Sequence, residues 1–113
     1  VFGRACANRI AEIAKPGDAI PTAPQDVGMD SVQELDRLRY ANGSTPTAAI
    51  RSDMQHVMQD KAAVYRTEEL LAEGKEEIDR VVRSFDDVHV TDKSLVWNTD
   101  LVETLELRNL LAC

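Results

Sequence analysis

The apolar residues between positions 96 and 111 recur with the spacing of one long helix. Val96 to Leu111 contains no Gly or Pro. Asn98 or Thr99 can cap this helix, and Asp100 would lie in its first turn, where a carboxylate is favoured. Its apolar side chains cover well over half of the circumference: Leu101, Val102, Leu105, Leu107, Leu110 and Leu111. We therefore predict a final helix that is buried on several sides.

Two further long helices are predicted before it. Thr45–Pro46 can open the first, with a capping hydroxyl followed by proline at the first helical position. Ile50, Met54, Val57, Met58 and Tyr65 continue that helical repeat. After a short break, Thr67 can cap the second, which runs to about Val88. Gly74 lies on the apolar face of this helix, at a cost in helix propensity, and so predicts the close approach of a neighbouring helix.

Long helices with short connections favour antiparallel neighbours. We therefore predict a three-helix antiparallel bundle, similar to a spectrin repeat, over residues 45–113. The residues expected between its helices are Ile50, Met54, Met58, Leu71, Ile78, Val82, Leu101 and Leu105.

A shorter helical pattern precedes the bundle. Phe2, Cys6, Ile10 and Ile13 fall on one face of a helix that the Lys-Pro-Gly sequence at 15–17 ends. Residues 18–29 contain two prolines and predict an extended loop.

A short helix is expected after that loop. Ser31 and Glu34 have the spacing of a capping box at its start, and Asn42–Gly43 predicts a left-handed C-cap at its end. No convincing strand is present, so the predicted class is all-α.

The composition restricts the partners. A chain of 113 residues with 43% hydrophobic residues can form one domain with a modest core. The net charge of −7, without a run of Lys or Arg, argues against nucleic acid and anionic membrane surfaces. No apolar run approaches the roughly 20 residues of a membrane span, and no signal peptide is visible. Cys6 and Cys113 provide no disulfide framework, which favours a reducing compartment.

Candidate chemistry is sparse. The chain has no glycine-rich phosphate loop, no Cys-x-x-Cys, no zinc-type His-Glu pair and no nucleophile elbow. His56 has only Asp53 and Asp60 at a weak metal-ligand spacing, and His89 is isolated, so both are interpreted as half-exposed histidines. Met54 and Met58 are interpreted as core residues and not as a cofactor site.

Glu103 and Glu106 form the one candidate carboxylate pair. They are interpreted as a solvated helix edge or as salt-bridge partners of Arg108 or of a neighbouring helix. No catalytic, cofactor-binding or metal-binding residue is assigned, and the residues alone describe an acidic helical interaction module.

Several segments resemble a known family. Val1–Ala5 resembles the helix that closes the FAD-binding domain in the flavoprotein subunit of succinate dehydrogenase and fumarate reductase. Residues 36–44, 54–59, 62–66 and 97–107 follow in the order and spacing of that family, most like its mitochondrial and alphaproteobacterial type.

The resemblance implies three regions. Residues 1–15 are the terminal helix of the FAD-binding domain, residues 16–44 are a loop and short helix, and residues 45–113 are the three-helix bundle of the helical domain.

The resemblance also implies a function for the parent protein. Such a subunit oxidises succinate to fumarate with FAD, and passes electrons to iron–sulphur centres and quinone, in the tricarboxylic acid cycle and electron transport. It is a peripheral subunit on the cytoplasmic face of the bacterial inner membrane or on the mitochondrial matrix side. The family's flavin-binding and substrate-binding residues lie outside this chain. We therefore expect a structural helical domain that is inactive alone, has no FAD of its own, and contacts the rest of the flavoprotein and the iron–sulphur subunit.

Other interpretations remain open. The first and last helices have no caps at the chain ends, which suggests a fragment. The chain could instead be a stand-alone interaction module, half of a split subunit, or a fragment of L-aspartate oxidase. We expect Phe2, Ile10 and some of Leu107, Leu110 and Leu111 to be exposed in the lone chain, or covered by another copy or another polypeptide.

Overall fold

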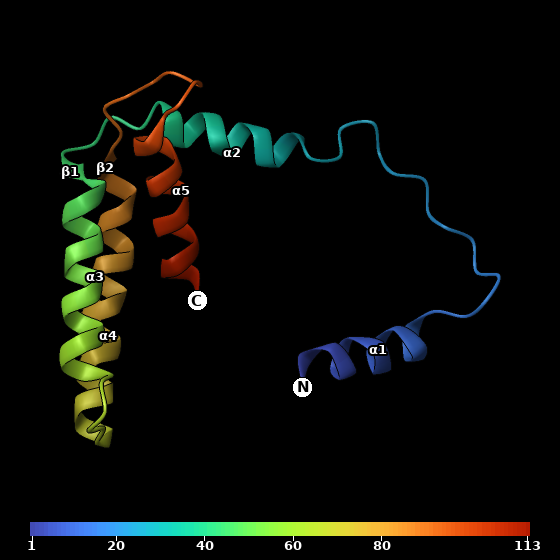
Figure 1. Cartoon of the computed structure of the whole chain (residues 1–113), viewed down its shortest axis with the longest axis horizontal. Coiled ribbons are helices and arrows are strands. Elements are labelled where there is room, and N and C mark those ends of the chain that lie inside the picture. Colours follow the sequence, from blue (N-terminus) through green and yellow to red (C-terminus); the bar gives the residue numbers. More distant parts are fainter.

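The structure is a computed structural model that describes all residues, 1–113, and it is mostly helical (Figure 1). The helices are α1 (Phe2–Ile13), α2 (Met29–Arg39), α3 (Thr47–Lys61), α4 (Glu68–Ser84) and α5 (Thr99–Ala112), with a 3-10 turn, η1 (Phe85–Asp87). Two short strands, β1 (Thr45–Pro46) and β2 (Val88–His89), form one parallel pair. The predicted all-α class is confirmed. None of the helices has the length and hydropathy that a membrane crossing requires.

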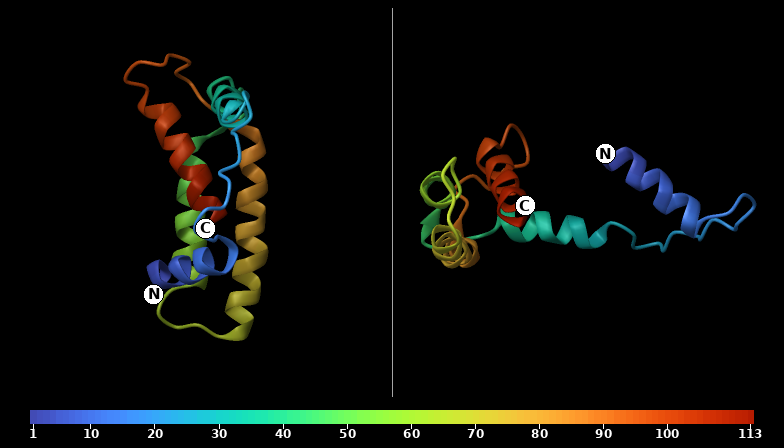
Figure 2. Two further views of the ribbon diagram at one scale, coloured as in Figure 1. Left: turned by 90° about the vertical axis from the view of Figure 1, so that its right-hand side faces the viewer. Right: turned by 90° about the horizontal axis from the view of Figure 1, so that it is seen from below.

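Helices α3 and α4 form a long antiparallel hairpin (Figures 1 and 2). Thr67 caps α4, because its side-chain oxygen accepts a hydrogen bond from the Leu70 N–H at 3.3 Å. At Gly74 a Cβ would lie only 2.6 Å from the Cβ of Lys61. The predicted cap and the predicted close approach at Gly74 are therefore both confirmed.

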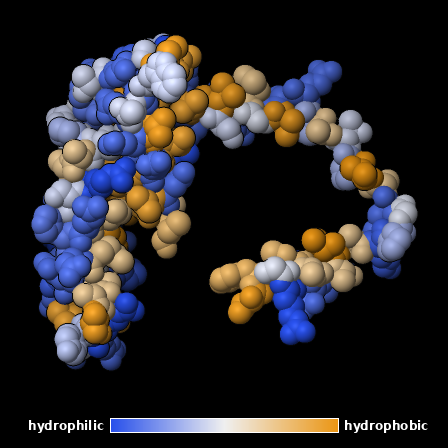
Figure 3. Space-filling view, viewed as in Figure 1, coloured by the Kyte–Doolittle hydropathy of each residue, from blue (hydrophilic) through white to orange (hydrophobic).

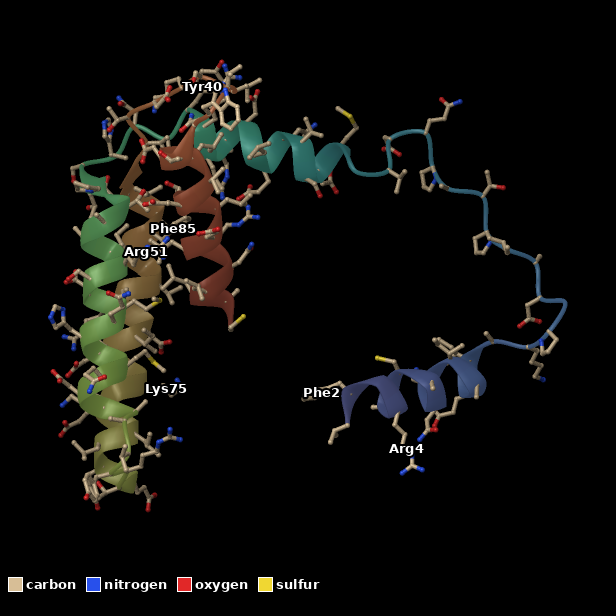
Figure 4. The ribbon with its side chains drawn as sticks, viewed as in Figure 1. Phe2, Arg4, Tyr40, Arg51, Lys75 and Phe85 are labelled. Atoms are coloured by element: carbon tan, nitrogen blue, oxygen red, sulfur yellow. The ribbon has the colours of Figure 1, made fainter.

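The last helix, α5, completes the bundle by packing against α3 and α2. It runs in the direction of α3 and against α4 (Figure 1). The hydroxyls of Thr47 and Thr104 are buried and lie 2.7 Å apart, which satisfies both polar groups between α3 and α5. Arg51 also reaches from α3 to α5, where it donates to the Glu103 carbonyl oxygen at 3.0 Å (Figure 4).

The core lies where the three helices meet the β2 strand. Its buried cluster consists of Ile50, Val81, Val88 and Leu107. Of the eight residues predicted to be buried, Ile50 and Leu101 are buried, whereas Met54, Ile78 and Leu105 are half-buried. The prediction is wrong for Met58, Leu71 and Val82, which are 50%, 44% and 41% exposed. Met58 and Leu71 lie toward the end of the α3–α4 hairpin that extends beyond α5, so no third helix covers them (Figure 1). Val82 lies in the last turn of α4, where its neighbour Val81 faces the core and Val82 does not.

The predicted helix start at Thr45 is wrong. Thr45–Pro46 forms strand β1, Thr45 pairs with Val88, and the helix begins at Thr47. The Thr45 hydroxyl donates to the Asp87 carboxylate at 3.2 Å, so it does not cap the helix. Ser44 donates to the same carboxylate, and these hydrogen bonds hold the pKa of Asp87 below its ordinary value, with that from Ser44 contributing most.

Both predicted ends of α2 are also wrong. The helix begins at Met29 after Gly28, whose φ of 88° needs glycine, and no side chain caps it. Ser31 lies inside the helix, and Glu34 pairs with arginines instead. At the other end the helix stops before Tyr40, and Gly43 has no left-handed φ. Gly43 is required for a different reason, since a Cβ there would lie 2.0 Å from the Asp87 carbonyl oxygen.

The first helix, α1, lies apart from the bundle, at the end of residues 14–28 (Figures 1 and 2). Every residue from 1 to 33 is exposed. The radius of gyration is 19.2 Å, against about 13 Å for a compact domain of this length. The predicted helix is confirmed, and its apolar face has no partner in the single chain.

Candidate interaction surface

The candidate site is an apolar groove beside the start of α5. One side of the groove is the loop before α5, and a network of hydrogen bonds holds this loop in place. The Asn98 side chain donates to the carbonyl oxygens of Asp92 and Ser94 at 2.7 and 2.8 Å. Its own oxygen accepts the Leu101 N–H at 2.8 Å, which confirms Asn98 as the cap of α5. Asp100 accepts the Thr91 N–H at 2.6 Å. Residues 91–98 are therefore closed into a loop by the first turn of the helix.

Lys93 and Arg39 join this loop to the end of α2. The Lys93 ammonium donates to the carbonyl oxygens of Ala41, at 2.6 Å, and Val90. Arg39 donates to the Lys93 carbonyl oxygen and stacks over the Tyr40 ring, 4.9 Å from its centre. These contacts set the position of the loop relative to α2.

An ion pair fixes α2 against α5. Arg108 donates to a Glu34 carboxylate oxygen at 2.9 Å, and Arg37 donates to the same oxygen at 2.8 Å. The hydrogen bond from Arg37, together with Arg108, holds the pKa of Glu34 below its ordinary value. Of the alternatives for Glu103 and Glu106, the salt bridge with Arg108 is wrong, because Arg108 pairs with Glu34 of α2.

The groove formed by these contacts has a volume of about 750 Å³. We call it the α5 groove; its apolar lining is Leu35, Leu95, Trp97, Leu101, Val102 and Leu105. Trp97 is 95% exposed and has a left-handed φ of 54°, which is costly for a bulky residue. Glu103 and Glu106 lie at the edge of the groove and form no salt bridge, whereas no basic residue lines it. The groove is apolar with an acidic edge.

Other exposed apolar residues lie in three places: on α1, on α5 and at the tip of the α3–α4 hairpin. Figure 3 shows hydrophobic side chains on α1 as well as on the bundle around α5 and α2. On α1, Phe2 and Ile10 are exposed, as predicted, and Phe2 projects from the helix without meeting another element (Figure 4). Leu110 is exposed on α5, whereas Leu107 is fully buried and Leu111 half-buried. Val64 and Tyr65 are exposed at the tip of the α3–α4 hairpin.

The residues considered for metal or acid–base chemistry do not converge. His56 is exposed, and its Nδ1 lies 2.8 Å from the Ser52 carbonyl oxygen of the same helix. His89 lies in β2, away from it in the chain. No group of three or more His, Cys, Asp or Glu side chains is placed to hold a metal ion. Glu103 and Glu106 are both exposed to solvent, so they lack the enclosed environment in which a carboxylate pair performs acid–base catalysis.

The α5 groove was not predicted from the sequence. The run Leu95-Val96-Trp97 could have indicated it, because these large apolar residues lie before the Asn98 cap and are therefore outside the helix. The Glu34–Arg108 pair had no signal, because 74 positions separate its members.

The fold and this surface define the class of protein: an all-α domain with a small core and several open apolar surfaces. Its relatives give the family. Residues 51–113 match the family model described as the fumarate reductase flavoprotein C-terminal domain. The chain therefore belongs to that family.

Individual relatives carry related names. The chain is 56% identical over 113 residues to a mitochondrial succinate dehydrogenase flavoprotein subunit of Xenopus laevis, covering all of this chain and 17% of the relative. It is 41% identical over 111 residues to the succinate dehydrogenase flavoprotein subunit of Rickettsia bellii, covering 98% of this chain and 19% of the relative. It is 33% identical over 110 residues to the fumarate reductase flavoprotein subunit of Escherichia coli, covering 95% of this chain and 18% of the relative. The chain thus spans less than a fifth of the length of these relatives.

The flavin of such subunits can be tested against the residues present here. A dinucleotide cofactor is usually held where a parallel strand turns through glycines into a helix, whose N-terminal N–H groups bind the phosphates. The parallel strands of this chain have two residues each. Thr47, which follows β1 without an intervening glycine, is buried against Thr104. This chain therefore has no dinucleotide-binding turn of that kind.

Proposed function

We propose that the chain is the structural helical domain of a succinate dehydrogenase flavoprotein subunit. In the whole enzyme, succinate is oxidised to fumarate with FAD, and electrons pass to iron–sulphur centres and quinone. The chain contributes no catalytic, cofactor-binding or metal-binding residue to this reaction. The observation that carries the proposal is 56% identity along the entire chain to a protein of that name.

The open apolar surfaces give this domain a physical role. Exposed apolar patches of more than a few hundred Å² usually mark contact sites. On this proposal residues 1–15, which include α1, belong to the FAD-binding part of the flavoprotein, and the rest of that part covers the apolar face of α1. Residues 16–44 connect this part to the helical domain. Residues 45–113 form the helical domain, which braces the flavoprotein beside its iron–sulphur partner. The enzyme lies as a peripheral complex at the bacterial inner membrane or on the matrix side of the mitochondrial membrane.

The first experiment measures flavin and activity in the purified chain. We expect no absorbance at the flavin band and no succinate-dependent reduction of a dye. A stoichiometric yellow chromophore, or dye reduction by the chain alone, would contradict the proposal.

A second experiment tests the structural role directly. This chain replaces the matching segment in the Xenopus laevis flavoprotein, and flavin content and succinate oxidation are measured. We expect the chimera to retain both, and the same chimera with Leu107→Asp to lose both, because that side chain is fully buried in the core. A soluble, folded chimera without flavin or activity would show that the chain does not serve as this domain.

A further inference from the structure

We draw no further inference here: the strongest candidate, the apolar α5 groove with the exposed Trp97 in its wall, carries none because nothing in the structure shows what covers it.

Discussion

Replacing Gly74 by alanine would put a methyl group where α4 touches α3. Two effects oppose each other. Alanine gains about 1 kcal/mol of helix propensity over glycine in a helix interior. The added Cβ would lie 2.6 Å from the Cβ and 3.3 Å from the Cγ of Lys61, and the Lys61 Cα is 3.9 Å away. The nearest atom is the root of the side chain, so a change of rotamer does not relieve the contact.

The helices must therefore separate locally, and overpacking of this kind costs about 1–3 kcal/mol. Separation would also stretch the ion pair between Lys61 and Glu73, whose nitrogen–oxygen distance is 2.8 Å. We expect Gly74→Ala to lower the free energy of unfolding by up to about 2 kcal/mol, as measured by urea denaturation followed by circular dichroism.

Two controls separate the effects. Ala72→Gly, at an exposed position of α4, measures the propensity difference alone and should destabilise by about 1 kcal/mol. In a Lys61→Gly background the obstructing Cβ is absent, and Gly74→Ala should then become stabilising by about 1 kcal/mol. If Gly74→Ala stabilises the otherwise unchanged chain by that amount, the close approach of the helices does not constrain this position.

Three further predictions concern the core, the cap and pH. Leu107→Ala should cost roughly 2–5 kcal/mol of unfolding free energy, and more than Leu105→Ala, because only Leu107 is fully buried; equal losses in urea titrations would contradict the assigned core. Asn98→Ala should lower the free energy of unfolding by about 1–3 kcal/mol, because it removes the N-cap of α5 and two hydrogen bonds to the preceding loop. A loss below a few tenths of a kcal/mol in the same titration would contradict this role. Hydrogen bonds lower the pKa of Asp87 from 3.8, so its carboxylate stabilises the fold fully above that pH, and this stabilisation is lost as the pH falls through the folded-state pKa. Asp87→Asn should therefore flatten the acid limb of a curve of unfolding free energy against pH. An unchanged acid limb would show that Asp87 does not contribute to the pH dependence of stability.

The family and the helices could be inferred because their signals are local. Helical periodicity, the Thr67 and Asn98 caps and the cost of a glycine at position 74 depend on residues within one or two turns. The same locality explains the absence of a predicted active site, since none of the short motifs for phosphate, zinc or nucleophilic chemistry is present. The resemblance to succinate dehydrogenase flavoproteins rested on contiguous segments, and the comparisons confirm it.

Local signals misassigned the residues whose partners lie far along the chain. Thr45 has a capping hydroxyl, but Asp87, 42 positions away, takes that hydroxyl and draws the residue into a strand. Gly43 follows Asn42 as a C-cap would, but the backbone of Asp87 is what excludes a side chain there. In both cases the competing contact comes from η1, which only the antiparallel return of α4 brings alongside.

Amino-acid sequence by itself determined where this chain is helical, how two of its helices start and to which family it belongs, because backbone hydrogen bonds and side-chain caps within a helix join near neighbours. Tertiary structure decided which helix faces are covered. Helix α5 ends before the hairpin does and leaves the far end of the hairpin uncovered (Figure 1). The Glu34–Arg108 pair sets α2 beside α5, and the loop closed by Asn98 presents Trp97 at the α5 groove. Periodicity identifies an apolar face, but only the lengths and directions of the neighbouring elements determine whether that face is buried.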